Sequence, residues 1–490
     1  MARNPDKLRP TEEEFLRLAR RGNVIPVYTQ ILADFETPLS AYLKLEGKGP
    51  AYLLESAEQG ERFGRYSFIG SEPRAVLKIR GRDSIAELEK LLSSYRGVQV
   101  PGLPRFSGGL VGYAGYDTVR FLEPVGRPKR NVLGVPDSVW MLSDTVVIFD
   151  HLEHVMKVVA NAVIPPGPAS TLPRRAKAAY AQAVRRVEEI TRKLQAPLRY
   201  LPARRGKKAA PPAAVRSNMS REAFISAVRK AKRAISEGEI IQAVLSQRFE
   251  VPARCAPFEI YRSLRSLNPS PYMFYLNLGE FALVGSSPEI LVRCEEGKVE
   301  VRPIAGTRRR GTTPAADRQI EEGLKRDPKE RAEHLMLADL GRNDIGRVCE
   351  YGSVKVSDLM TVERYSHVMH LVSHVEGKLR KGKNAFDVFR AAFPAGTVSG
   401  APKVRAMQII NELEPDSRGP YAGAVGYFGF NGNSDTCITI RTVLAKNGRA
   451  FVQAGAGIVA DSKPEKEYQE TRNKAAGMLQ AIHLAERGLA

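Results

Sequence analysis

One segment near the middle of the chain limits its possible folds more than any other feature. The segment lacks the hydrophobic periodicity of a helix or strand, and it therefore divides the sequence into two parts. Residues 196–214 are dense in Pro, Ala, Arg and Lys, a composition typical of an exposed linker. Because 490 residues exceed the usual size of one domain, we expect the linker to separate two domains. The predicted ranges are 20–195 for the N-terminal domain, 196–217 for the linker and 218–486 for the C-terminal domain.

Both halves mix short β-like runs with amphipathic helical patterns. In the N-terminal half, 145–149 and 154–163 predict a hairpin, and 175–194 predicts a helix rich in Ala, Arg and Glu. The C-terminal half alternates strand-like runs at 242–251, 273–278, 282–285, 290–301 and 436–446 with helical patterns at 220–236, 327–340, 402–413 and 463–486. This mixture predicts an α+β fold in which helices pack on antiparallel sheets.

Composition and charge exclude several classes of protein. The formal charge of +21 admits a nucleic-acid binder, but the basic residues are spread out and no aromatic-interleaved RNA motif accompanies them. We therefore expect no nucleic acid, and an acidic partner or an anionic substrate accounts for the charge as well. No apolar run approaches the ~20 residues that span a bilayer, and no secretory signal is recognisable. With four scattered cysteines and no CxxC pair, a cytoplasmic protein without membrane association is expected.

Two predicted helices each carry a pair of carboxylates three residues apart. Glu330 and Glu333 share a face of the helix that begins at Asp327, and Glu467 and Glu470 share a face of the last helix. Brought together, the two faces would form an oxygen-rich site suited to Mg²⁺. On spacing alone, two solvent-exposed helix faces explain these pairs more simply.

Glycine-rich segments in the same half are candidates for binding an anion. The loop 396–402 leads directly into a helix, whose exposed backbone N–H groups favour negative charge. Gly455 and Gly457 follow a strand and permit close approach of a ligand. Arg441 precedes them and has the geometry to bind a carboxylate with two hydrogen bonds. Turns alone would also account for these glycines.

Three histidines, His367, His370 and His374, lie close together in the sequence. His370 and His374 have the helical spacing of some zinc ligands, but the surrounding residues alternate as in a strand and no HExxH pattern is present. A structural or proton-transfer role is therefore expected rather than a zinc site.

Taken together, several motifs resemble those of the chorismate-utilising enzymes, and they occur in the family's order across 220–480. The segments that carry the resemblance are 303–308, 333–337, 339–344, 393–403, 421–427, 453–457 and 470–475. The resemblance implies the family's two-domain α+β fold. It also implies that Glu333 and Glu470 bind Mg²⁺, with Glu330 and Glu467 close by.

Three features select among the activities of this family. Relatives that add water to chorismate have a lysine base where this chain has Gln242, so the resemblance implies ammonia as the nucleophile. Ala305 lacks the lysine nucleophile that is frequent in aminodeoxychorismate synthases. Segments 53–56 and 271–273 resemble the two parts of a tryptophan feedback site. The residues assigned to tryptophan binding are Ser56, Pro271, Tyr272 and Met273.

These features imply conversion of chorismate and ammonia to anthranilate and pyruvate, inhibited by tryptophan; aminodeoxychorismate synthesis by a component I enzyme is the alternative. The chain departs from the family pattern at Arg309, where proline is usual, and at Gly341, where alanine is common. Neither position is expected to touch substrate. No Gly-x-Cys-x-Gly segment of a glutamine amidotransferase is recognisable, so a separate glutaminase subunit and a hetero-oligomer are expected.

The resemblance also implies roles for individual residues. Glu289 matches the general acid that protonates the departing C4 hydroxyl, a role that requires a raised pKa. His370 is the candidate for assisting the release of pyruvate, and Thr307 joins Glu289 and His370 as a predicted catalytic residue. The residues assigned to chorismate binding are Gly306, Thr307, Tyr421, Arg441, Gly455, Ala456 and Gly457.

Overall fold

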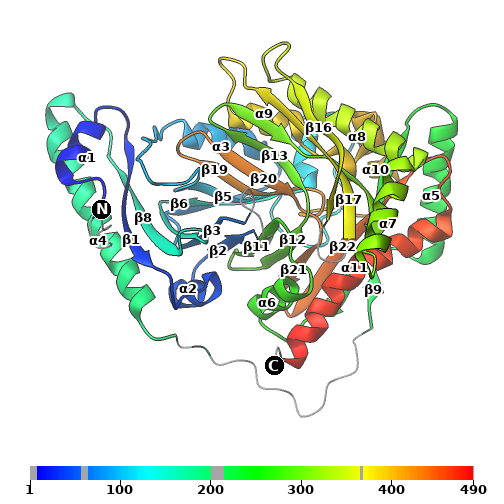
Figure 1. The fold of residues 1–490 in the computed structure, drawn as a ribbon, viewed down its shortest axis with the longest axis horizontal. Helices are drawn as coiled ribbons and strands as arrows, with labels where there is room; N and C mark the ends of the chain where they lie inside the picture. The colour runs from blue at the N-terminus through cyan, green and yellow to red at the C-terminus, as the bar shows by residue number, and fades with distance from the viewer. Residues whose placement is uncertain (1–7, 57–63, 199, 201–213, 365–367, 489–490) are drawn as a thin grey trace.

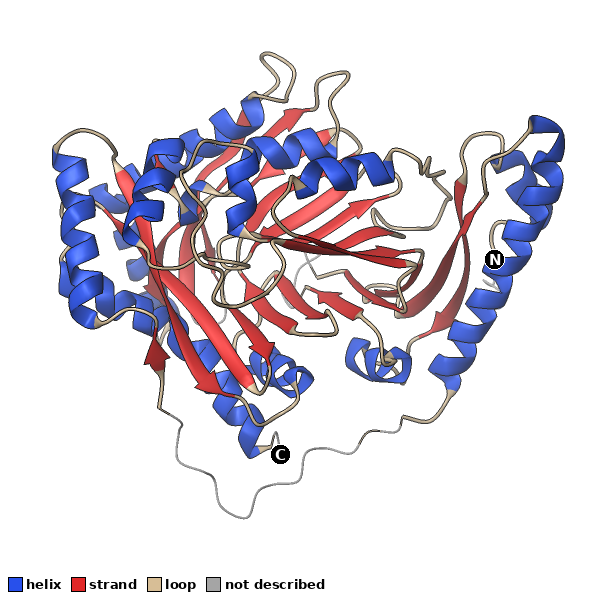
Figure 2. Cartoon of the chain, turned by 180° about the vertical axis from the view of Figure 1, so that it is seen from behind, coloured by secondary structure: helices blue, strands red, loops and turns tan. Residues whose placement is uncertain are grey.

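The computed structural model describes residues 8–56, 64–198, 200, 214–364 and 368–488 (Figure 1). Two large antiparallel sheets form the body of the molecule, and helices pack around them (Figure 2). The α+β class predicted from the sequence is confirmed. Most of the predicted linker lies outside the described residues.

The larger sheet contains 12 strands. In spatial order they are β1 (Val24–Leu32), β8 (Val155–Val163), β7 (Thr145–Asp150), β3 (Tyr66–Ser71), β2 (Ala51–Glu55), β11 (Tyr272–Asn277), β12 (Ala282–Ser287), β21 (Thr442–Lys446), β22 (Arg449–Ile458), β10 (Gln242–Pro252) and β18 (Gly400–Ala401), with β9 (Arg216–Ser217) paired to β10. The predicted hairpin at 145–163 is confirmed as β7 and β8.

The smaller sheet contains 10 strands. In spatial order they are β15 (Ile304–Arg309), β17 (Val368–Lys378), β14 (Lys298–Val301), β13 (Ile290–Glu295), β20 (Ser434–Ile438), β19 (Ala424–Gly429), β5 (Gly109–Ala114), β6 (Ser138–Ser143) and β4 (Ala75–Ile79), with β16 (Lys355–Arg364) paired to β17. His370 and His374 lie on β17, so the alternating pattern was the better guide to this segment than the helical spacing. His367 lies outside the described residues.

Each sheet combines strands from both halves of the chain. In the larger sheet β2 pairs with β11, and in the smaller sheet β5 pairs with β19. The ranges 20–195 and 218–486, predicted as two domains, therefore contribute to the same two sheets. They also share the largest hydrophobic cluster, which extends from Phe15 to Ala485.

Helices surround the two sheets. The α-helices are α1 (Glu12–Leu18), α2 (Pro38–Leu45), α3 (Ser84–Leu92), α4 (Leu172–Gln195), α5 (Arg221–Ser236), α6 (Pro257–Leu267), α7 (Pro314–Arg326), α8 (Pro328–Gly346), α9 (Ala385–Ala392), α10 (Lys403–Leu413) and α11 (Pro464–Arg487). Short 3₁₀ helices are η1 (Tyr116–Phe121), η2 (Ala169–Thr171) and η3 (Gly396–Val398). Within the described ranges, no helix combines the length and the apolar character that crossing a membrane requires.

The start of α8 illustrates how the sequence sets a helix boundary. The carboxylate of Asp327 accepts hydrogen bonds from the backbone N–H groups of Lys329 and Glu330, and Pro328 occupies the first turn. An N-terminal cap followed by proline is a strong start signal, because both satisfy or remove N–H groups that lack helical partners. The cap fixes the register of α8 and hence the face that carries Glu333.

The prediction of one strand over 436–446 is wrong. This run forms the end of β20 in the smaller sheet and β21 in the larger sheet, and Arg441 between them has φ of +51°. The hydrophobic pattern continues through the break because both strands are buried in sheets. The hydrophobic pattern therefore does not indicate that the chain passes from one sheet to the other.

Candidate active site

Glu289 lies where the chain passes from the larger sheet to the smaller one, between β12 and β13. Its side chain is buried, with 7% of the residue exposed. Burial raises the pKa of Glu289 to about 8, although the nearby Thr397 hydroxyl and the backbone N–H of Ile304 lower the pKa. The carboxyl group is therefore protonated at neutral pH, as a proton donor must be.

Arg441 lies at a second crossing between the sheets, and the two crossings touch. The backbone N–H of Ser286 donates to the carbonyl of Arg441 over 3.1 Å, and that of Ile438 donates to the carbonyl of Glu289 over 3.0 Å. An acid and a guanidinium predicted to serve one substrate thus come from adjacent turns of the backbone. These hydrogen bonds set the spacing between them.

The edge of the smaller sheet brings Gly306 and His370 together. Nδ1 of His370 lies 3.1 Å from the carbonyl oxygen of Gly306, and Thr307 is the register partner of His370. Because a carbonyl only accepts, Nδ1 carries the proton of the neutral ring. Burial lowers the pKa of His370, so the neutral form dominates at pH 7. Gly306 has φ of +59°, which favours glycine at this position.

The predicted metal ligands lie on two different helices, Glu333 on α8 and Glu470 on α11. Burial and the neighbouring charge of Glu330 raise the pKa of Glu333. Burial also raises the pKa of Glu467, and the charge of Glu470 adds to the effect. Like charges held close together in a half-buried region fit a divalent cation, which would offset their repulsion.

Lys474 links α11 to the glycine-rich strand β22. Its ammonium group lies 2.7 Å from a carboxylate oxygen of Glu470 and donates to the carbonyl of Gly455 over 3.1 Å. Arg441 in turn donates to the backbone carbonyl of Lys474 over 3.3 Å. The sequence assigned no role to Lys474; its position one turn beyond Glu470 was the available signal.

Two glycines of β22 allow side chains to approach its backbone. A β carbon on Gly455 would lie 2.6 Å from the hydroxyl of Tyr421, and one on Gly457 would lie 2.6 Å from the amide nitrogen of Gln242. Either substitution would force these side chains to move. Ala456, between the glycines, is fully buried. The predicted substrate-binding residues of β22 therefore lie beside Tyr421 and Gln242.

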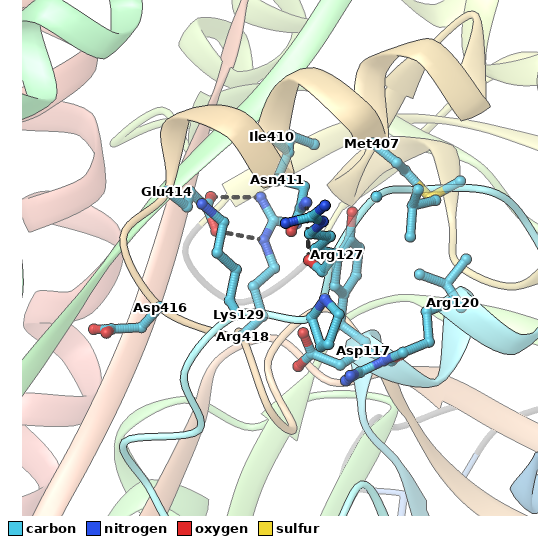
Figure 3. Close-up of a pocket in the computed structure, with 15 residues that line it drawn as sticks. Asp117, Arg120, Arg127, Lys129, Met407, Ile410, Asn411, Glu414, Asp416 and Arg418 are labelled. Carbon is cyan, nitrogen blue, oxygen red and sulfur yellow. Dashed lines mark hydrogen bonds and ion pairs between the residues drawn. The ribbon is translucent and has the colours of Figure 1, made fainter. Parts of the chain in front are cut away.

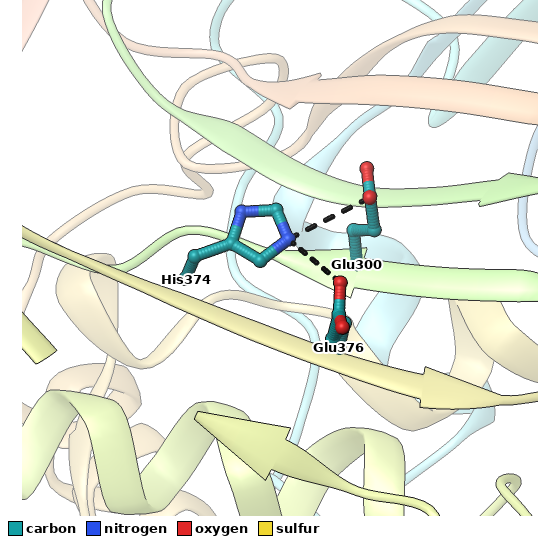
Figure 4. A group of neighbouring side chains, drawn as sticks. All are labelled: Glu300, His374 and Glu376. Carbon is teal, nitrogen blue, oxygen red and sulfur yellow. Dashed lines mark ion pairs between the residues drawn. The ribbon is translucent and has the colours of Figure 1, made fainter. Parts of the chain in front are cut away.

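One group of three side chains in the described chain has the spacing for a metal ion, but it contains neither predicted ligand. It consists of Glu300, His374 and Glu376, whose ligand atoms lie within 4.8 Å of one another (Figure 4). Lys298 lies 2.8 Å from the carboxylate of Glu300 and 2.6 Å from that of Glu376. The lysine supplies a positive charge there, as Lys474 does beside Glu470. Glu333 and Glu470 lie elsewhere, on α8 and α11.

A separate cavity of about 140 Å³ gathers the four residues predicted to bind tryptophan, Ser56, Pro271, Tyr272 and Met273. Its walls come from β2, β3 and β11 of the larger sheet and from β13, β19 and β20 of the smaller sheet, so the cavity lies between the two sheets. The hydroxyl of Ser56 is buried and has no hydrogen-bond partner in the part of the chain that the structure describes. Such a hydroxyl suits a ligand that brings its own polar group.

A smaller cavity, of about 30 Å³, lies between the segment 116–129 and the end of α10 (Figure 3). Arg418 forms an ion pair of 2.7 Å with Glu414 at its inner wall. The same guanidinium group lies over the ring of Tyr421, 5.5 Å from its centroid. No residue predicted for the active site lines this cavity, but Arg418 supports Tyr421 from behind.

Comparison with known proteins identifies the family. The family described as chorismate binding enzyme matches residues 49–480, well beyond the 220–480 span of the motifs. Anthranilate synthase component 1 of Pseudomonas putida is 49% identical over 498 residues, covering 97% of this chain and 98% of the relative. That of Aquifex aeolicus is 49% identical over 491 residues, with the same coverage of both.

Solved structures show the same fold. Anthranilate synthase component I from Streptococcus pneumoniae aligns with a TM-score of 0.75 and 35% identity, over 92% of this chain and 99% of that one. The menaquinone-specific isochorismate synthase of Escherichia coli aligns with a TM-score of 0.71 and 21% identity, over 96% and 98%, which shows the fold alone. The chain belongs to the chorismate binding enzyme family and, within it, to the anthranilate synthase component 1 group.

Proposed function

We propose that this chain converts chorismate and ammonia to anthranilate and pyruvate in tryptophan biosynthesis. The observation that carries the proposal is the buried Glu289, whose raised pKa keeps it protonated and whose backbone turn is hydrogen-bonded to the turn that carries Arg441. Membership of the anthranilate synthase component 1 group supports the same activity. Gln242 supports ammonia as nucleophile, because an amide cannot deprotonate water at neutral pH.

In the first step ammonia forms a bond to C2 of the chorismate ring. The ring double bonds shift, the C4–O bond breaks, and Glu289 gives its proton to the leaving hydroxyl, which departs as water. The new ammonium group then loses one proton, which returns the Glu289 carboxylate to its protonated form, so atoms and charge balance. A neutral carboxyl group suits this role because it can donate a proton and carries no charge in the buried site before the reaction.

In the second step the ring becomes aromatic. The proton at C2 leaves, the C3–O bond to the enolpyruvyl group breaks, and the released enol becomes pyruvate. His370 is neutral at pH 7 and therefore has the capacity to accept a proton. Its hydrogen bond to Gly306 holds the ring with Nδ1 protonated, so a proton transfer by His370 would use Nε2.

Chorismate carries two carboxylates, and we assign different residues to each. Tyr421, Arg441 and the β22 backbone at Gly455–Gly457 form the candidate site for the enolpyruvyl carboxylate. Glu333 and Glu470 would hold Mg²⁺, and bound Mg²⁺ would offset the charge of the ring carboxylate. Gly306 and Thr307 would position the ring between these two ends.

The partner and the regulator follow from the same assignment. A separate glutamine amidotransferase subunit would supply ammonia, in keeping with the component 1 name of the relatives. Tryptophan would bind in the cavity that contains Ser56 and Tyr272, and we place the assembly in the cytoplasm. Neither the glutaminase subunit nor tryptophan changes which residues of this chain perform the chemistry.

Product identification tests the proposal. The purified chain is incubated with chorismate, Mg²⁺ and excess ammonium salt at mildly alkaline pH, where both unprotonated ammonia and protonated Glu289 are present, and products are separated by chromatography with fluorescence detection. Anthranilate and pyruvate in equal amounts are expected. Aminodeoxychorismate as the product would contradict the assignment, and so would the absence of turnover in a folded protein.

A further inference from the structure

A row of polar side chains crosses one face of the smaller sheet. Residues that lie directly opposite each other on paired antiparallel strands point to the same face of the sheet. The register places five such residues in line across five neighbouring strands. In spatial order this polar row consists of Tyr427 (β19), Asp435 (β20), Arg293 (β13), Glu300 (β14) and Glu376 (β17).

One end of the polar row lies in the cavity assigned to tryptophan, whose walls include Tyr427, Asp435 and Arg293. Arg293 donates from Nε to the carboxylate of Asp435 over 3.0 Å and from Nη2 to the hydroxyl of Tyr272 over 3.2 Å. The Tyr272 hydroxyl in turn donates to Asp435 over 2.9 Å. Because these three side chains are bonded to one another, a ligand that contacts Tyr272 or Asp435 also acts on Arg293.

The other end of the polar row lies on β17, the strand that carries His370. Residues His370, His374 and Glu376 alternate along β17, so their side chains share one face of it. Nε2 of His374 lies 3.4 Å from a carboxylate oxygen of Glu376 and 3.6 Å from one of Glu300 (Figure 4). The strand therefore runs directly from the polar row to the predicted catalytic histidine.

Glu300 joins the two ends of the row. Its carboxylate accepts a hydrogen bond of 3.5 Å from Nη1 of Arg293 and lies 2.8 Å from the ammonium group of Lys298. The interaction with His374 is the largest of the causes that lower the pKa of Glu300 to about 2, so the side chain is ionised at neutral pH. This one carboxylate thus attracts Arg293 from the cavity and Lys298 and His374 from the other side.

The contacts of Arg293 allow two arrangements. Its guanidinium group lies 3.0 Å from Asp435 but 3.5 Å from Glu300, so the cavity side holds it more closely. Arg105 lies 3.3 Å from Asp435 and would keep that carboxylate paired if Arg293 moved. A ligand whose polar groups engage Asp435 would favour the arrangement in which Arg293 lies closer to Glu300. Glu300 would then be drawn away from β17.

We propose that Glu300 couples the tryptophan cavity to β17: bound tryptophan moves Arg293 toward Glu300, and the resulting shift of β17 displaces His370. The inference rests on the proposed function, because it takes tryptophan as the ligand and chorismate as the substrate. It gives a regulatory role to a residue that does not line the cavity and that the sequence did not single out.

Calorimetric titration of tryptophan, with and without chorismate, tests the coupling. Ammonia and glutamine are left out, so that chorismate binds without being aminated. Linked binding is reciprocal, so a tryptophan that hinders chorismate binds more weakly when chorismate is present. In the wild type we expect saturating chorismate to raise Kd for tryptophan about tenfold or more. In Glu300→Gln the rise should be about twofold or less, with Kd in the absence of chorismate unchanged.

Two further variants sharpen the test. Glu350→Gln is the matched control, because Glu350 also pairs with a residue of β17, Lys378 at 3.1 Å, but lies outside the polar row. This control should respond to chorismate as the wild type does. His374→Gln breaks the connection from the β17 side and keeps Glu300, so it should lose the response as Glu300→Gln does. It serves on its own if Glu300→Gln fails to fold.

The outcomes separate the two proposals. If tryptophan does not bind the wild type, the regulatory part of the proposed function fails. If the wild type responds to chorismate and both Glu300→Gln and His374→Gln keep the full response, the coupling role of Glu300 is overturned while regulation by tryptophan stands. Loss of tryptophan binding by Glu300→Gln without chorismate also overturns the role, because Glu300 would then shape the cavity rather than transmit its occupancy.

Discussion

The side-chain amide of Gln242 donates a hydrogen bond of 3.4 Å to a carboxylate oxygen of Glu333. The contact joins the first residue of β10 to the second turn of α8. The residue that points to ammonia as nucleophile thus touches a predicted metal ligand. Its other polar atom, Oε1, is buried without a hydrogen-bond partner in the described part of the chain, so a donor is missing there.

Replacing Gln242 by Met should weaken magnesium binding in a pH-dependent way. The hydrogen bond from Gln242 lowers the pKa of Glu333, against burial and Glu330, which raise it. Without the bond more of Glu333 is protonated as pH falls, and a protonated carboxyl is a poor ligand. Magnesium titrations of activity at about pH 6.5 and about pH 8 should show the larger loss of affinity at the lower pH. An equal loss at both would contradict this coupling.

Glu470→Gln should raise the magnesium concentration needed for half-maximal activity by about tenfold or more, because an amide removes one anionic ligand. Glu465→Gln is the control, since Glu465 is exposed in the first turn of the same helix. The measurement is activity against free Mg²⁺ at saturating chorismate. A magnesium response identical to that of the wild type would remove Glu470 from the metal site.

Glu289→Gln should lower kcat by about 100-fold or more while leaving KM for chorismate nearly unchanged, because the amide keeps the shape but cannot transfer the proton. A defect confined to KM would argue against the acid role.

The same substitution should also change how stability depends on pH. The pKa of Glu289 is about 8 in the folded chain against an ordinary value of 4.5. The unfolded chain therefore ionises first, and stability falls as pH rises from 4.5 to about 8. At pH 7 the loss of stability caused by the raised pKa amounts to roughly 3 kcal/mol. Glu289→Gln should remove this pH-dependent loss. Denaturant unfolding across this pH range measures the difference, and equal slopes in the two proteins would contradict the raised pKa.

Ser56→Ala should relieve inhibition by tryptophan and spare catalysis. The Ser56 hydroxyl is buried in the 140 Å³ cavity and has no hydrogen-bond partner among the residues that the structure describes, so we expect a bound ligand to provide one. Loss of that bond should weaken inhibition by about tenfold. Ser93→Ala, at an exposed position outside the cavity, should behave like the wild type. Full inhibition of Ser56→Ala would place the regulatory site elsewhere.

Local signals in the sequence predicted local structure well. Asp327 and Pro328 marked the start of α8, and alternation marked β17, because caps and hydrophobic periods act over a few residues. The predicted site residues on different elements could be grouped only through the family resemblance. Nothing in the spacing of Glu289 and Arg441 indicates that their backbone turns touch.

The remaining features depend on contacts between distant segments. The pairing of β2 with β11 joins residues more than 200 positions apart, and it brings Ser56 and Tyr272 to the wall of one cavity. The raised pKa of Glu289 likewise comes from burial, which a single sequence does not report. Lys474 belongs to the site because α11 packs beside β22, where its ammonium group reaches the carbonyl of Gly455.

The most direct test of the account is the pH dependence of chorismate amination in a single turnover, at a constant concentration of unprotonated ammonia. Protonated Glu289 is the proton donor, so the rate should fall as pH rises through about 8, and the residual rate of Glu289→Gln should lack this limb. A wild-type rate that stays level or rises beyond that pH would contradict the role of Glu289, and with it the mechanism built on this site.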